Sequence, residues 1–104
     1  MDLYFDKKEL KNFKKLGMSD AEIEELRLHK LLENVLDTNC NRASERLGRK
    51  IVFSDNSGVF KLFLKTAKGG YVELNCKAET LIANYELALQ ELDFDLRNRL
   101  YYLA

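Results

Sequence analysis

The sequence predicts an α+β fold with an N-terminal helical hairpin, a three-stranded antiparallel sheet and a long C-terminal helix. Three observations indicate this fold: two helix-capping motifs near the N-terminus, apolar residues that alternate with a period of two from residue 50, and a return to the helical period from residue 78. The length of 104 residues and the 46% share of hydrophobic residues suit one hydrophobic core. We therefore expect a single domain over 1–104.

Two helix starts predict the hairpin over 1–37. Each is a capping box, an N-cap side chain followed three residues later by a glutamate, and the two boxes are Asp6 with Glu9 and Ser19 with Glu22. The first helix should run over about 7–16 and end at Gly17, since glycine readily takes the left-handed conformation that ends helices. The second helix should begin at residue 20 and reach about Leu36.

The polar residues 37–41 predict a break after the second helix. Asn41 has a side chain suited to cap a short helix within 41–48, and Gly48 should end that helix. The residues that follow are typical of a strand, which argues against a DNA-reading helix-turn-helix at this point.

A three-stranded antiparallel meander is predicted over 50–77. Apolar residues alternate with other residues in three runs: Ile51 and Phe53; Phe60, Leu62 and Leu64; Val72, Leu74 and Cys76. The segments between the runs, 55–58 and 67–70, are rich in turn formers and short enough for hairpins. Parallel pairing would need a crossover segment, for which the sequence leaves no room.

One unbroken helix is predicted over 78–103. Eight of its apolar residues fall on one side, and they are Leu81, Tyr85, Ala88, Leu89, Leu92, Leu96, Leu100 and Leu103. The helical phase is kept across Asp93, where a new helix would otherwise be able to begin. We therefore expect the helix to continue through Asp93 and to dock on the sheet by its leucine side.

Composition and motifs exclude several classes of function. No apolar run is long enough to span a bilayer and the first twenty residues carry charges throughout, so we expect a soluble cytoplasmic protein without a secretory signal. The two cysteines have no CxxC spacing and should be reduced, with Cys76 buried on the core face of the sheet and Cys40 accessible in the polar break. The single histidine, His29, stands in no recognisable catalytic or ligand motif. We therefore predict no enzyme activity, no metal and no cofactor.

Charge is segregated along the chain although basic and acidic residues number 17 each. Residues 42–77 hold eight basic and three acidic residues, whereas 18–41 hold two basic and six acidic ones. The outer face of the sheet should combine aromatic and basic side chains, namely Val59, Lys61, Phe63, Lys65 and Tyr71. Of these, Lys61, Phe63, Lys65 and Tyr71 are candidates for nucleic-acid binding, because aromatic rings stack on bases while lysines contact phosphates. The alternative is that a helix covers the apolar members of this face.

The order helix, three antiparallel strands and helix over 20–92 resembles the topology of a double-stranded-RNA-binding domain. The final helix of that order, over 78–92, bears alanines and leucines, in keeping with the resemblance, which implies RNA binding. The family places a cluster of basic residues at the start of the last helix. This chain has Lys77, Ala78, Glu79 and Thr80 there, with one lysine and one acid, so the family's main phosphate contact is missing.

A second apolar stripe runs along the predicted C-terminal helix. Leu87, Phe94 and Tyr101 recur every seven residues and project nearly opposite to the leucine side, and Tyr102 adds to an apolar terminus. The stripe needs a partner of its own, either the two N-terminal helices or another chain. We therefore predict a non-catalytic protein-binding module with a regulatory, inhibitory or adaptor role, whose partner is another protein or a second copy in a homodimer. The alternative function is a nucleic-acid-binding module that uses the sheet.

Overall fold

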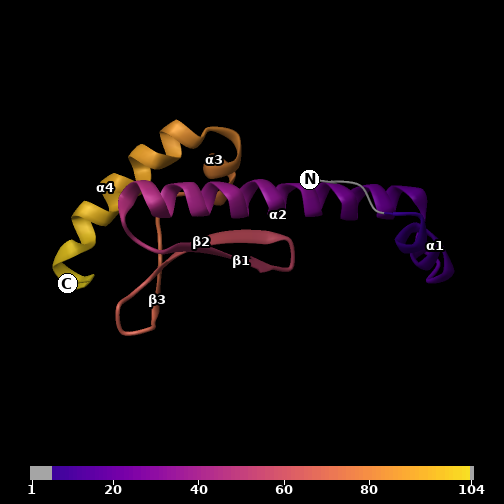
Figure 1. Cartoon of the computed structure of the whole chain (residues 1–104), viewed down its shortest axis with the longest axis horizontal. Coiled ribbons are helices and arrows are strands. Elements are labelled where there is room, and N and C mark those ends of the chain that lie inside the picture. The colour runs from indigo at the N-terminus through magenta and orange to yellow at the C-terminus, as the bar shows by residue number, and fades with distance from the viewer. Residues whose placement is uncertain (1–5, 104) are drawn as a thin grey trace. The chain divides into compact units, whose positions relative to one another are not determined.

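The computed structural model describes residues 6–103, with their side chains over 6–98, and it has the α+β fold that the sequence predicts (Figure 1). In chain order the elements are α1 (Lys7–Lys15), α2 (Asp20–Leu47), β1 (Ile51–Asn56), β2 (Val59–Lys65), β3 (Tyr71–Glu73), α3 (Ala78–Ala83) and α4 (Tyr85–Leu103). The chain divides after Asn34 into two compact units, and the single domain stays a prediction. No helix within the described residues is long and apolar enough to cross a membrane.

Both predicted capping motifs are present in the first unit. The Asp6 carboxylate accepts a hydrogen bond of 2.8 Å from the backbone N–H of Glu9 and starts α1. The Ser19 hydroxyl accepts one of 3.2 Å from the backbone N–H of Glu22, whose carboxylate in turn accepts one of 3.4 Å from the N–H of Ser19. Gly17 has a φ of +81° between the two helices, so the predicted helix end is confirmed.

The predicted break at 37–41 is wrong, because α2 is one helix from Asp20 to Leu47 and the separate helix within 41–48 does not exist. Neither proline nor glycine stands inside α2. Its buried stripe also continues through the polar stretch at helical spacing, with Leu36, Cys40 and Ala43 all buried. Packing of this stripe outweighs the weak helix propensity of the neighbouring asparagines.

The predicted meander is confirmed, with strands in the order β1-β2-β3 and both pairs antiparallel. A serine near the end of α2 ties the sheet to that helix. The Ser44 hydroxyl donates a hydrogen bond of 2.7 Å to the carbonyl of Cys40 and accepts one of 2.9 Å from the N–H of Ile51, the first residue of β1. The third strand is shorter than predicted. Beyond β3, the N–H of Leu74 still bonds the carbonyl of Leu62 at 2.9 Å, and then the chain leaves the sheet.

The core of the second unit lies between one face of the sheet and the helices of that unit. It gathers buried side chains from every layer, among them Leu36 and Ala43 of α2, Ile51, Leu62 and Leu64 of the strands, Leu81 of α3, and Ala88, Leu92 and Leu96 of α4. The strand residues in this set share one face, since Ile51 pairs with Leu64 and side chains alternate along a strand. The helices of this unit therefore cover a single face of the sheet.

The C-terminal helix is broken once, where the sequence predicted no break. α3 and α4 are separated by Asn84, which has φ −146° and ψ 84°. Its side-chain oxygen accepts a hydrogen bond of 3.3 Å from the N–H of Leu87, so Asn84 acts as the N-cap of α4. The helix does continue through Asp93, as predicted. At the start of α4 the Arg42 guanidinium lies 4.1 Å from the ring centroid of Tyr85. This cation–π contact links α2 to α4.

Candidate interaction surfaces

Among the side chains of α4 that the structure describes, those up to residue 98, two large apolar ones lie exposed on the outer face of the helix. Leu87 is 45% exposed and Phe94 is 69% exposed, whereas Ala88 and Leu92, on the opposite side of the helix, are fully buried in the core. A separation of seven residues returns to nearly the same helix face, which is why the two exposed residues share one surface. We call Leu87 and Phe94 the α4 outer face.

The two other residues that the sequence assigned to this surface, Tyr101 and Tyr102, have side chains outside the described residues. The second half of α2 belongs to the same unit as α4 and leaves Leu87 and Phe94 exposed. The choice between the N-terminal helices and another chain as the partner of this face stays open.

A hollow of about 660 Å³ lies beside Phe94, with Lys77, Glu91 and Asn98 among its lining residues. One wall of this hollow is fixed by Asp95, which is 5% exposed. Its carboxylate accepts two hydrogen bonds of 3.0 Å from Asn75, one from the backbone N–H and one from the side-chain amide. These charge-assisted bonds join the segment after β3 to α4, and they place polar groups in the wall of the hollow.

The outer face of the sheet combines aromatic, aliphatic and charged side chains in cross-strand rows. The register gives the rows Lys65 with Tyr71, Val52 with Phe63 and Glu73, Ser54 with Lys61, and Asn56 with Val59. The four candidates for nucleic-acid binding are therefore neighbours on one face. Their role stays a prediction.

No described helix of the second unit covers this face of the sheet. Val59 is 55% exposed and Tyr71 is 61% exposed, while Phe63 is half-buried. A shallow hollow of about 420 Å³ is lined by Val52, Phe53, Ser54, Phe63 and Tyr71. Lys61 forms an ion pair of 3.4 Å with Glu73, which reduces its attraction for phosphate.

The sequence interpretation missed one basic residue of this face. The N–H of Lys65 donates a hydrogen bond of 2.9 Å to the carbonyl of Lys50, so the two lysines are paired across β1 and β2. The signal was in the sequence, because Ile51 faces the core and the alternation places Lys50 on the outer face.

Both cysteines are free thiols buried in the core, so the expected accessibility of Cys40 is wrong. Cys40 is 2% exposed and Cys76 is 5% exposed. Cys40 is buried because the polar stretch around it continues the helix and turns this side chain inward. Burial, with the nearby Asp37 carboxylate, raises the pKa of Cys40 to about 12. Burial, with the carboxylates of Glu91 and Asp95, also raises the pKa of Cys76 to about 12.

We expect the two buried thiols to lower the stability at alkaline pH. In the unfolded chain a thiol ionises near its ordinary pKa of 9.0, whereas Cys40 and Cys76 stay protonated to about pH 12 in the folded state. The folded state thus holds protons that the unfolded state releases, so the free energy of unfolding falls as the pH rises above about 9. Each thiol should contribute a loss of about 1.4 kcal/mol between pH 8 and pH 10. Urea unfolding at the two pH values measures this loss.

A double variant, Cys40→Ala with Cys76→Ala, is the control for the alkaline effect. It should be less stable than the wild type at pH 8, because two small cavities replace the sulfur atoms. Between pH 8 and pH 10 its free energy of unfolding should fall less than that of the wild type, and the difference should equal the loss that the two thiols cause. Equal losses in both proteins would contradict the raised pKa values.

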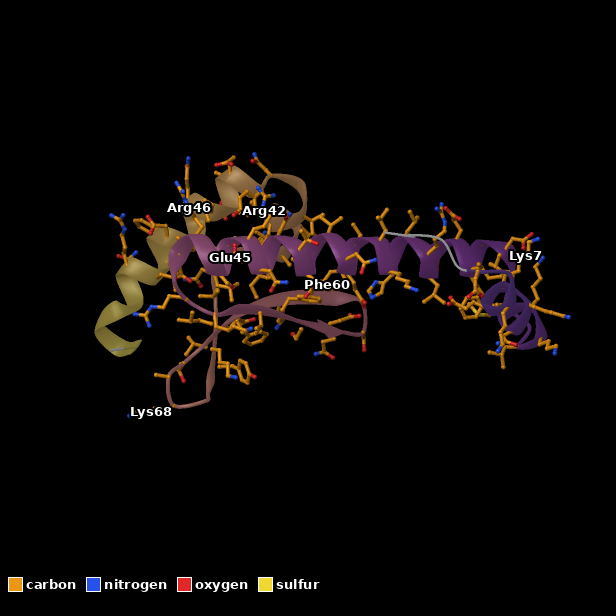
Figure 2. The ribbon with its side chains drawn as sticks, viewed as in Figure 1. Lys7, Arg42, Glu45, Arg46, Phe60 and Lys68 are labelled. Carbon is orange, nitrogen blue, oxygen red and sulfur yellow. The ribbon has the colours of Figure 1, made fainter. Side chains whose placement is uncertain are left out.

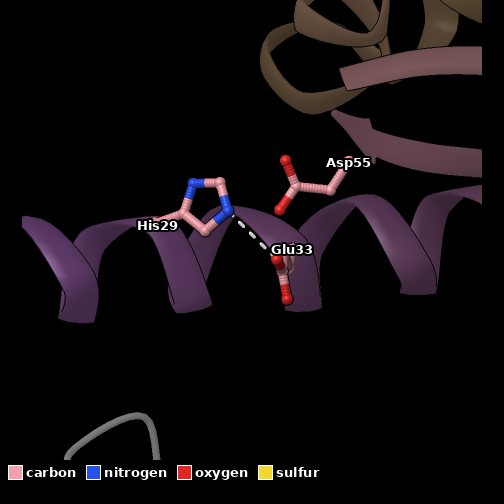
Figure 3. A group of neighbouring side chains, drawn as sticks. All are labelled: His29, Glu33 and Asp55. Atoms are coloured by element: carbon pink, nitrogen blue, oxygen red, sulfur yellow. Dashed lines mark ion pairs between the residues drawn. The ribbon is translucent and has the colours of Figure 1, made fainter. Parts of the chain in front are cut away.

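A histidine and a glutamate, both residue types that bind metals, lie side by side on α2 in the first unit. The His29 imidazole lies 3.0 Å from the Glu33 carboxylate, one turn further along α2 (Figure 3). The two side chains form an ion pair when His29 is protonated.

Comparison of the chain with protein-family models, curated proteins and solved structures finds no match.

Proposed function

We propose that this chain is a non-catalytic protein-binding module that docks a partner protein on the α4 outer face. The observation that carries the proposal is the 69% exposure of Phe94 on a helix whose opposite side is fully buried. Burial of a phenylalanine against a partner stabilises a complex by about 1.5 to 3 kcal/mol. Glu91 and Asn98, which line the adjacent hollow, supply the polar rim that surrounds the apolar centre of many interfaces.

A second copy of the chain is the partner that this face favours. Two copies of one helix face are self-complementary when they pair antiparallel, because Leu87 of one copy then lies beside Phe94 of the other. Both residues are buried twice in such a symmetric dimer, once in each copy. A regulatory, inhibitory or adaptor role follows from association of this kind, since the surface acts by binding alone.

The substitution Phe94→Asp tests this proposal. We expect the wild type to dimerise and the variant to dimerise at least about 100-fold more weakly, because two phenylalanines are lost from the symmetric interface and two carboxylates are placed in it. Sedimentation equilibrium over a range of concentrations measures both dissociation constants. The variant should keep the monomer's free energy of unfolding to within about 0.5 kcal/mol, since Phe94 is exposed in the monomer.

Two further variants serve as controls for this test. Phe94→Leu keeps an apolar side chain and should retain most of the dimer, whereas Asn41→Asp adds the same charge at an exposed position of α2 and should leave the dimer unchanged. A wild type that is monomeric at every concentration, with no effect of Phe94→Asp on its mass, would contradict the proposal.

A further inference from the structure

The outer face of the sheet carries a row of three side chains. This row is separate from the α4 outer face. Lys65 pairs with Tyr71 on one side, and its N–H bonds the carbonyl of Lys50 on the other. The row across the sheet is therefore Lys50, Lys65 and Tyr71. All three side chains are exposed.

The two lysines of this row lie directly opposite each other, an arrangement in which like charges repel. Neither forms an ion pair with another residue that the structure describes. By contrast, Lys61 on the same face is paired with Glu73 at 3.4 Å. An anionic ligand would relieve the repulsion between Lys50 and Lys65.

Further basic side chains stand at the same end of the sheet. Arg49 precedes Lys50, and Lys68 is at the tip of the turn between β2 and β3, pointing away from the helices (Figure 2). Of the two acidic residues of the strands, Asp55 lies near the far end of β1, and Glu73, two residues from Tyr71, is paired with Lys61. Positive charge is thus concentrated beside Tyr71.

The aromatic side chains of this face provide a platform for bases. Tyr71 is 61% exposed, and Phe63 lies on the neighbouring strand, diagonal to Tyr71 in the register. Both line the hollow of about 420 Å³ on the outer face. Aromatic rings beside a basic track are the combination that binds single strands, whose unpaired bases are free to stack.

We propose that the outer face of the sheet binds single-stranded nucleic acid, with Tyr71 and Phe63 stacking on bases and Lys50 and Lys65 contacting phosphates. An acidic peptide would satisfy the lysines but would leave the aromatic platform without a flat partner. A duplex would hide its bases from the rings. The face lies on the side of the sheet away from the core and α4, so this proposal does not rest on the α4 outer face.

Fluorescence anisotropy with a labelled twelve-nucleotide oligouridine, over 50 to 200 mM salt, tests the proposal on the full chain. We expect binding whose logarithm of affinity falls with the logarithm of salt concentration at a slope of about −1.4, or about −0.7 for each of two phosphate contacts. The double variant Lys50→Gln with Lys65→Gln should weaken binding and remove most of that slope. The variant Tyr71→Leu should weaken binding by about 5- to 150-fold and leave the slope unchanged.

A matched control removes two positive charges elsewhere in the same unit. Arg46, on α2, and Lys77, at the start of α3, are exposed and lie outside the row, so Arg46→Gln with Lys77→Gln should bind as the wild type does. The variant Phe94→Asp should also bind normally, which separates this test from that of the proposed function. Circular dichroism melts show whether each variant is folded.

Three results would overturn the proposal. The first is no binding of oligouridine at 50 mM salt. The second is binding that Tyr71→Leu leaves unchanged, which would indicate a patch for any polyanion. The third is equal affinity for a twelve-base-pair duplex or a polyglutamate peptide of the same length, which would assign the face to another class of ligand.

Discussion

The substitution Asn39→Asp is expected to lower the free energy of unfolding by about 3 kcal/mol or more at neutral pH. Asn39 is buried in α2, and its side-chain amide donates a hydrogen bond of 2.8 Å to the carbonyl of Leu81 in α3. The substitution replaces the donor by an oxygen, so two acceptors face each other and a charge is buried. Arg42 donates a hydrogen bond of 3.5 Å to the side-chain oxygen of Asn39 and keeps an acceptor there in the variant, but it does not supply the lost donor.

Urea unfolding of Asn39→Asp and Asn41→Asp at pH 7 measures this effect against a matched control. The two variants make the same chemical change half a turn apart on α2, but Asn41 is exposed, so its variant should stay within about 0.5 kcal/mol of the wild type. Burial raises the pKa of the carboxyl introduced at position 39, and its protonated form is able to donate to Leu81. The penalty is therefore present above the ordinary pKa and should shrink as the pH falls towards 4. Equal stabilities at pH 7 would contradict the buried hydrogen bond.

The substitution Asn41→Pro is expected to cost about 3 kcal/mol or more, because position 41 lies inside one continuous helix. Proline removes the hydrogen bond from the N–H of residue 41 to the carbonyl of Asp37, and its ring clashes with that carbonyl. Buried residues flank the site on both sides, with Cys40 before it and Ala43 after it, so a local kink would displace the core. Thermal and urea unfolding measure the loss.

The variant Asn41→Ala distinguishes the continuous helix from the break that the sequence predicted. If residue 41 capped a short helix, alanine would cost about 1 kcal/mol and proline would be tolerated. In the continuous helix the order is reversed, since alanine should be neutral or slightly stabilising and proline strongly destabilising. A tolerated proline together with a harmful alanine would therefore contradict the structure.

Local signals in the sequence predicted the helix starts and the strands well. A capping box such as Ser19 with Glu22 acts within four residues, and the alternation of Phe60, Leu62 and Leu64 states directly which face is buried. The continuity of α2 was missed because the residue types around Asn39 and Cys40 suggest a polar break when their packing is not known. Their role is tertiary, since Asn39 bonds a carbonyl 42 residues away and Cys40 packs in the core.

The break at Asn84 was missed for the opposite reason. The apolar phase from Leu81 to Ala88 fits one helix, and nothing in that periodicity reports a single residue that leaves the helical conformation. Asparagine is a good N-cap, so the residue type was the available signal. Periodicity predicts which side of a helix is buried more reliably than where the helix is interrupted.

The two candidate surfaces were predicted to different extents. The shared exposed face of Leu87 and Phe94 follows from helix phase, and the aromatic and basic outer face of the sheet follows from strand alternation. The sequence did not say whether a helix of the same unit covers the sheet, because that depends on how the elements pack. The pairing of Lys50 with Lys65 was also not predicted. It depends on how β1 and β2 align, which the pattern within one strand does not give.

The meander has a consequence for the order in which the chain folds. Each strand pairs with its neighbour in sequence, and the bond between Ser44 and Ile51 joins residues only seven apart, so these contacts close short loops. The bond between Asn39 and Leu81 closes a separation of 42 residues, at an entropic cost about 1.6 kcal/mol higher. We therefore expect the second half of α2 and the sheet to assemble first, and the docking of α3 and α4 onto them to set the folding rate.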